Sequence, residues 1–243
     1  MTLLLRMAVR NILRHKRRTL FTFLVLSVSA AVYIFYTCLL DGFNRQSFEN
    51  MIAFESGHIR IAHPGEDTDP LSLSNCLTPA QTAAARRVIA ALPQVKAAVP
   101  RLHFQAEIDN MQDSAPCRVT GLDPREDGWV FPLRRMTRLA TLSSNTAILG
   151  FRLARDMRVG IGDSFYLTFR REAGMLESMS FTVSDLVATG YPDIDGGTVL
   201  LSLETARRIS AAGGPSELNL LLHDPAAVLQ ARNTLRASLD RKS

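Results

Sequence analysis

A long apolar run near the N-terminus constrains this chain more than any other feature. Between Arg18 and Asp41 lie 22 residues, TLFTFLVLSVSAAVYIFYTCLL, without a charged side chain. As a helix that rises about 1.5 Å per residue, the run is roughly 33 Å long, which matches a hydrocarbon core of about 30 Å. The sequence therefore predicts a transmembrane helix over residues 19–40.

The same run has some features of a cleavable signal peptide. The small residues Val28, Ser29 and Ala30 resemble a cleavage site. However, the apolar run continues for ten residues beyond Ala30, which makes it longer than the apolar region of a signal peptide. A retained membrane anchor is therefore the favoured interpretation.

The distribution of charge predicts the orientation of this anchor. The 243-residue chain has a formal net charge of +5, and its first forty residues hold six basic side chains and no acidic one. The other 203 residues carry 22 Lys and Arg against 23 Asp and Glu, a net charge of −1. By the positive-inside rule, residues 1–18 lie in the cytoplasm and residues 41–243 outside it. A nearly neutral domain does not favour nucleic acid as a partner.

Residues 1–18 predict an amphipathic basic arm at the membrane interface. Leu5, Ala8, Val9 and Ile12 follow helical spacing. The basic residues of the arm that we expect at the interface are Arg6, Arg10, Arg14, Arg17 and Arg18. Two interpretations stay open, a helix lying in the anionic headgroup layer and a plain charge cluster that only sets topology.

The residues beyond the anchor predict an α+β domain. Helical character continues over residues 41–54, and Thr78, Pro79 and Gln81 form a capping-box start for a helix that stops at Pro93. Strands are expected near residues 57–61, 95–109, 116–122, 146–149, 164–171, 179–190, 198–202 and 218–222, and further helices near 151–157, 203–210 and 224–243. This order predicts a split α+β subdomain, residues 41–123 and 214–243, with a β-rich inserted subdomain at 124–213.

The sequence offers no set of residues for catalysis, a cofactor or a metal. It lacks a P-loop, and Gly160 and Gly162 precede a strand, which predicts a turn and not a dinucleotide loop. His58 and His63, with Glu55 and Asp67 nearby, are spaced for opposite strand faces and do not favour a shared metal ion. We therefore expect no enzyme activity.

Two cysteines allow a disulfide outside the cytoplasm. Cys76 and Cys117 would close a loop of about 40 residues, which the chain-entropy model rates at about 3–4 kcal/mol. Spacing alone does not show whether the two Cα atoms approach closely enough.

Several short motifs, in order along the chain, resemble bacterial ABC transporter permeases of the MacB/LolC/LolE/FtsX type. The first is MAVRNILRHKRRT at residues 7–19, an A-x-R-N-x-x-R-x-x-x-R-T arm leading into a membrane helix, and SGHIRI at 56–61 is similar to the segment after that helix in LolC/LolE-like members. The others occupy residues 119–124, 147–150, 153–154, 159–163, 181–190, 203–206 and 220–225. The resemblance lies in the ordered series over nearly the whole chain.

This resemblance implies a MacB-like periplasmic core domain in a bacterial inner membrane protein. It implies a permease subunit, of the lipoprotein-releasing or macrolide-exporter type, that acts as a homo- or heterodimer and couples ATP hydrolysis by a separate P-loop ATPase to motion of the periplasmic domain. Permeases of this type have three more membrane helices after the core domain, and this sequence has no counterpart to them. We therefore expect an N-terminal part, either a fragment or one half of a split permease. The alternative is a single-pass anchored periplasmic adaptor or sensor without transport activity.

Overall fold

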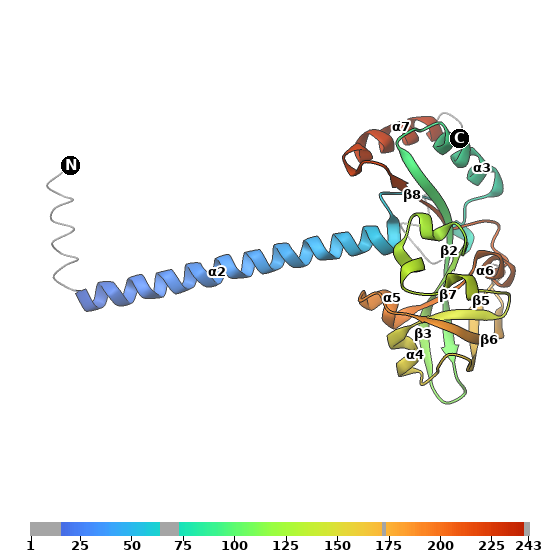
Figure 1. The fold of residues 1–243 in the computed structure, drawn as a ribbon, viewed down its shortest axis with the longest axis horizontal. Coiled ribbons are helices and arrows are strands. Elements are labelled where there is room, and N and C mark those ends of the chain that lie inside the picture. Colours follow the sequence, from blue (N-terminus) through green and yellow to red (C-terminus); the bar gives the residue numbers. More distant parts are fainter. Residues whose placement is uncertain (1–15, 64–72, 172–173, 241–243) are drawn as a thin grey trace. The chain divides into compact units, whose positions relative to one another are not determined.

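The chain consists of a long helix and an α/β domain. The computed structural model describes residues 16–63, 73–171 and 174–240, and these divide into two compact units between Glu49 and Asn50 (Figure 1). Arg6, Arg10 and Arg14 of the predicted arm lie outside the described residues, whereas Arg17 and Arg18 lie in the first turn of the long helix.

Helix α2 (Lys16–Met51) contains the predicted membrane span and continues beyond it. No residue of this helix is buried, and its exposed side chains include Phe21, Phe23, Tyr33 and Phe35. A helix that is apolar on all of its faces is normally buried in a protein core or spans a membrane, and is not left exposed to water. By length and composition it is the one helix in the described residues that can cross a membrane.

The second unit begins where α2 changes its winding. A π-helical segment, η1 (Ile52–Ser56), follows α2 and ends at Gly57. The helical extension expected over residues 41–54 is therefore present, but its last part is wound more loosely than an α-helix. The remaining elements are β1 (Ile59–Ala62), η3 (Leu73–Asn75), α3 (Pro79–Ala90), β2 (Val95–Asp109), β3 (Ser114–Leu122), η4 (Asp127–Trp129), η5 (Pro132–Arg135), η6 (Leu139–Thr141), β4 (Thr146–Gly150), α4 (Phe151–Asp156), β5 (Ser164–Arg170), β6 (Leu176–Val187), α5 (Pro192–Gly197), β7 (Thr198–Ser202), α6 (Leu203–Ser210), β8 (Glu217–Leu222), η7 (Pro225–Ala227) and α7 (Val228–Asp240).

The eight strands of the described residues form one sheet, in the order β1-β8-β2-β3-β7-β4-β6-β5. An additional pairing between β2 and β5 joins the last strand back to the third, so six strands close into a barrel. β3 with β7 and β4 with β6 are parallel pairs, and the other pairs are antiparallel. The side chains at alternating positions of β5, Phe165, Leu167 and Phe169, belong to the main core cluster.

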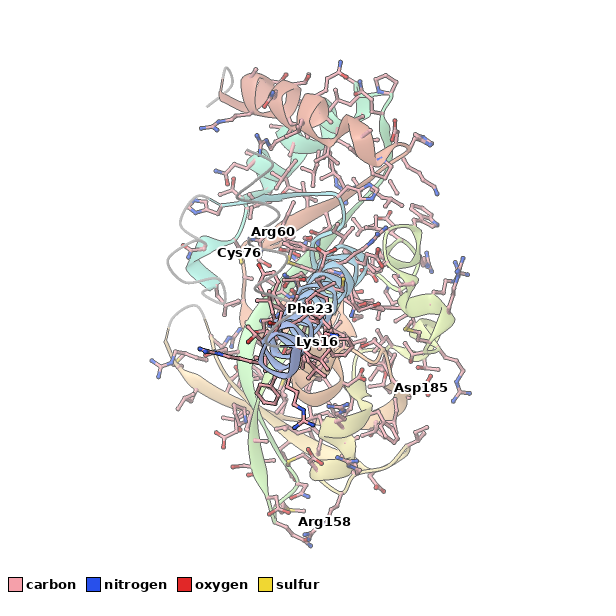
Figure 2. The ribbon with its side chains drawn as sticks, turned by 90° about the vertical axis from the view of Figure 1, so that its left-hand side faces the viewer. Lys16, Phe23, Arg60, Cys76, Arg158 and Asp185 are labelled. Atoms are coloured by element: carbon pink, nitrogen blue, oxygen red, sulfur yellow. The ribbon has the colours of Figure 1, made fainter. Side chains whose placement is uncertain are left out.

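The strands outside the barrel form a second layer with helices. β8 pairs with β1 on one side and with the first half of β2 on the other, and helices α3 and α7 pack against each other beside them (Figure 1). Val88, Ile89, Leu220 and Leu235 share a core cluster there. Arg158, by contrast, lies at the end of the domain remote from α3 and α7 (Figure 2).

The predicted fold class is confirmed. A long apolar N-terminal helix is followed by a domain with a split α+β layer and a β-rich module. Strand β2 contributes to both parts, because Ala98 pairs with β8 whereas Ile108 pairs with β5. The residue boundaries 1–18, 19–40, 41–123 with 214–243, and 124–213 stay a prediction.

Candidate functional site

A group of buried polar side chains lies where the chain passes from η1 into the sheet. We call this group the junction and define it by two parts. The first is an arginine clamp made by Arg101, Asp127, Phe131 and the carbonyl of Phe54; the second is a network around Glu217. All of these residues belong to the second unit, and Arg60 of the network is labelled in Figure 2.

The arginine clamp holds η1 on the sheet. Arg101, on β2, is only 2% exposed, and Asp127 is fully buried. The Arg101 Nε donates to Asp127 Oδ1 at 2.8 Å and its Nη2 to Oδ2 at 3.0 Å, a bidentate ion pair. Its Nη1 donates to the carbonyl oxygen of Phe54 at 2.7 Å.

The ring of Phe131 completes the surroundings of this guanidinium. The Arg101 Cζ lies 3.4 Å from the ring centroid, in cation–π geometry. A π-helical carbonyl, a 3₁₀ turn and a strand are thereby fixed to one cation. Removal of that cation would break all three contacts at once.

The second part of the junction is a network around the Glu217 carboxylate, which is 2% exposed. Glu217 Oε1 accepts from Asn219 Nδ2 at 2.6 Å and lies 3.0 Å from His103 Nε2, while Oε2 accepts from Arg60 at 3.1 Å. Burial alone would raise the pKa of Glu217, but His103, Asn219 and Arg60 outweigh it and lower the pKa to about 2. Glu217 is therefore an ionised carboxylate that joins β1, β2 and β8.

His103 also connects this network to the barrel. Its Nδ1 lies 3.0 Å from the hydroxyl of Thr120 on β3, so hydroxyl, imidazole and carboxylate form a chain. Hydrolases use such a chain for nucleophilic attack, together with free N–H donors for the oxyanion. Here Thr120 is 5% exposed, on a strand paired on both sides with β2 and β7. The arrangement links strands β2, β3 and β8.

A cavity of about 360 Å³ lies against the junction. Its polar wall includes Arg60, His103 and Glu217, and its apolar wall includes Leu133 and Leu200. At its lining, Arg118 pairs with Glu55 of η1 at 3.0 Å, with both side chains partly exposed.

The backbone conformation of Gly57 determines the direction in which the chain leaves η1. Its φ of +62° and ψ of −156° lie in a region available almost only to glycine. A Cβ at this position would also lie 2.9 Å from the carbonyl oxygen of Leu220 on β8.

We expect Gly57→Ala to destabilise the domain by about 1–3 kcal/mol, because the alanine would be strained and crowded. Denaturant unfolding of the full chain in detergent measures this. Gly42→Ala is the matched control, since Gly42 lies in α2 with nothing within 4 Å of a Cβ, and the substitution raises helix propensity. Equal stability of the two variants would contradict the backbone strain and crowding that we infer for an alanine at position 57.

The candidate metal ligands and the glycine turn of the sequence analysis lie in separate parts of the structure. His58 accepts from the backbone N–H of Leu222 at 3.1 Å, which is a structural role at the edge of the sheet, and Asp67 lies outside the described residues. No group of three or more His, Cys, Asp or Glu that could hold a metal occurs among the described residues. Gly160 and Gly162 lie in a turn before β5, as predicted.

The cysteine pair lies near one core cluster. Cys117, on β3, belongs to this cluster, and Cys76 packs against it. Cys117 carries a free thiol, so the disulfide is not formed in this structure. Burial raises the pKa of this thiol to about 12, which slows its oxidation. The Cys76–Cys117 bond stays a prediction, which mass spectrometry of the non-reduced chain tests.

The junction itself was missed by the sequence interpretation. Its available signal was Arg101 inside the apolar strand sequence AAVPRLHF, because a buried charge requires a partner. Nothing local pointed to Asp127 as that partner.

Comparisons with known proteins identify relatives in sequence and in structure. No protein family model matches the chain. Two proteins called lipoprotein-releasing system transmembrane protein LolC, from Xylella fastidiosa strains Temecula1 and 9a5c, are 28% and 27% identical to it over 142 residues. The match covers 54% of this chain and 34% of each LolC, so the chain spans about a third of the length of these relatives.

A solved structure shares the fold. The extracellular domain of the noncanonic ABC-type transporter YknZ from Gram-positive bacteria superposes with a TM-score of 0.50 at 10% identity, over 75% of this chain and 92% of that domain. The periplasmic region of MacB from Actinobacillus actinomycetemcomitans superposes with a TM-score of 0.47 at 10% identity, over 75% of this chain and 81% of that region. The LolC match and the YknZ fold confirm the resemblance to the N-terminal part of a MacB/LolC-like permease.

Proposed function

We propose that this chain is the N-terminal part of a permease subunit in an ABC transporter of the lipoprotein-releasing or macrolide-exporter type. In this proposal α2 crosses the bacterial inner membrane, residues 1–18 lie in the cytoplasm and the domain lies in the periplasm. ATP hydrolysis in a separate P-loop ATPase subunit moves the periplasmic domain. The permease acts as a homo- or heterodimer, and its contact with the ATPase is made by the polypeptide that follows or accompanies this one.

The proposal rests on one structural observation, the arginine clamp, which occurs in a chain that is similar to LolC. η1 continues directly from α2, and Arg101 binds the carbonyl of Phe54 in η1 while it pairs with Asp127. A force on the helix would therefore reach the strand and the 3₁₀ turn through one guanidinium. Interior packing transmits such a displacement because it is dense and hard to compress.

Purification of the tagged full chain from its native membranes tests the transporter proposal. We expect a P-loop ATPase subunit and a second permease polypeptide in the complex, with ATP hydrolysis as the readout. Arg101→Met should weaken the effect of nucleotide on the domain, measured by hydrogen exchange of residues 52–57. Arg118→Met, which removes the partly exposed ion pair between β3 and Glu55 of η1 but leaves the buried clamp intact, is the matched control. A chain that carries neither ATPase nor second permease would instead support the anchored adaptor or sensor.

The orientation of α2 has a separate test. Alkaline phosphatase, which folds only outside the cytoplasm, is fused after residue 60 and, in a second variant, before residue 1. We expect activity only from the fusion at residue 60, because the basic residues precede the apolar run. Activity only from the N-terminal fusion would reverse the proposed topology.

A further inference from the structure

A groove outside the junction lies at the ends of the parallel strands β3 and β7. Leu122 ends β3 and Ser202 ends β7, and the two residues are partners in the ladder, so the strands end at the same level. The carboxyl ends of parallel strands are a common position for ligand sites in α/β sheets. The groove has a volume of about 1040 Å³, against roughly 300–1,000 Å³ for small-molecule sites. The proposed coupling of α2 to the domain does not use it.

Two of the motifs that resemble the permeases, the one at the end of β3 and the one at the start of α6, meet at this groove. Their small residues have a packing role, because a Cβ on Gly121 would collide with the side chain of Ala206. Glu204, in the first turn of α6, also suits the helix dipole. Packing gives no such reason for Asp123, and both acids line the groove.

The charged side chains of the groove balance one another. Those that line it are Arg125, Arg134, Arg138, Asp123 and Glu204. Arg138 is paired with Asp185, which lies beside the groove, at 3.4 Å. Three arginines therefore face three acids, and the groove has no net charge with which to attract an ion of either sign.

Much of the hydrogen-bonding capacity of these groups is unused. In the part of the chain that the structure describes, no hydrogen bond or ion pair involves the side chains of Arg125, Arg134 or Glu204. Asp123 Oδ1 accepts from the backbone N–H of Arg125 at 2.8 Å. Guanidinium groups only donate and carboxylates only accept, so the groove offers strong donors together with strong acceptors.

The floor of the groove is apolar. Leu139 and Leu142 line it and are buried, and Leu203 lines it and is half-buried. Small-molecule sites combine such an apolar surface with a few polar groups that fix orientation. A sugar ring matches this combination, because each hydroxyl both donates and accepts while the C–H face of the ring is apolar.

We propose that this groove binds an uncharged sugar. The hydroxyls of the sugar donate to the carboxylates of Asp123 and Glu204 and accept from the guanidinium groups of Arg125 and Arg134. The C–H face of the ring packs on the leucine floor. This inference depends neither on the proposed membrane span nor on the permease function.

Saturation-transfer NMR on the full chain, in a detergent whose headgroup contains no sugar, tests the proposal. The probes are glucose, galactose and N-acetylglucosamine, added separately. We expect saturable transfer to the ring protons of at least one of them. Arg134→Ala/Glu204→Ala removes one cation and one anion, so the net charge is unchanged, and should lower the affinity about tenfold for each group removed.

Arg155→Ala/Asp156→Ala is the matched control, because it removes an ion pair of opposite charges whose side chains are 68% and 67% exposed. It lies in α4, which follows the end of β4, whereas the groove reaches Ser144 before the start of that strand. The control should bind the sugar like the wild type. No transfer to any of the three sugars, or equal affinity in the two double variants, would overturn the proposal. Stronger transfer to glycine betaine than to the sugars would overturn it in favour of a zwitterion.

Discussion

Replacing Arg101 with methionine is expected to destabilise the domain by about 3–5 kcal/mol, the usual cost of removing one partner from a buried ion pair. The substitution leaves the fully buried Asp127 carboxylate without its cation and the carbonyl of Phe54 without a donor. It also removes the contact with the Phe131 ring. Denaturant unfolding of the full chain in detergent, followed by Trp129 emission, measures the loss.

Two further variants separate the clamp from a general effect of charge. Arg118→Met removes an ion pair whose side chains are 45% and 32% exposed, and should cost less than about 1 kcal/mol. Arg101→Met/Asp127→Leu removes both charges, so it should recover much of the stability lost by Arg101→Met. An Arg101→Met chain as stable as Arg118→Met would show that the clamp does not hold η1.

The same clamp shows what local sequence cannot predict. Arg101 and Asp127 are 26 residues apart, and the local sequence around Arg101 does not indicate that Asp127 is its partner. Their pairing arises only when the loop after β3 folds back over β2. A periodicity argument treats each element alone, so it gives no information on such contacts.

The closure of the barrel could not be predicted from the sequence either. Strand β2 pairs with β5 through residues such as Ile108 and Leu167, which are far apart in sequence. The strands themselves were predicted from alternation, and β2 begins and ends where expected, at Val95 and Asp109. Which edges join depends on packing of the whole core, including Phe104 and Phe169 in edge contact at 6.0 Å between ring centroids.

Helix starts were predictable because their signals are local. The expected capping box is present at α3, where Gln81 N–H donates to Thr78 Oγ1 at 3.2 Å and Thr78 N–H donates to Gln81 Oε1 at 2.9 Å. Ser202 caps α6 by accepting from Thr205 N–H at 3.1 Å. A cap needs only residues within one turn, so the sequence contains the complete interaction.

Acid should weaken the domain through Glu217 over a defined range. Its pKa is lowered from 4.5 to about 2 in the folded domain, so folding favours the ionised carboxylate. The stabilisation is therefore fully present above pH 4.5 and is lost as the pH falls toward 2. Because a tenfold change in a protonation equilibrium corresponds to about 1.4 kcal/mol, the ionised Glu217 stabilises the fold by about 3 kcal/mol.

Glu217→Gln isolates this contribution from the other carboxylates. The amide has nearly the same shape but cannot ionise or form an ion pair with Arg60, so the variant should be less stable than the wild type at neutral pH. The difference between them should shrink as the pH falls from 4.5 toward 2, because the unfolded wild-type chain then binds a proton at Glu217 whereas the folded domain binds it only near pH 2. Unfolding curves of both full-length chains across this range measure it. A difference that stays constant with pH would mean that the network tolerates a neutral Glu217, and that His103 and Arg60 do not depend on its charge to join β1, β2 and β8.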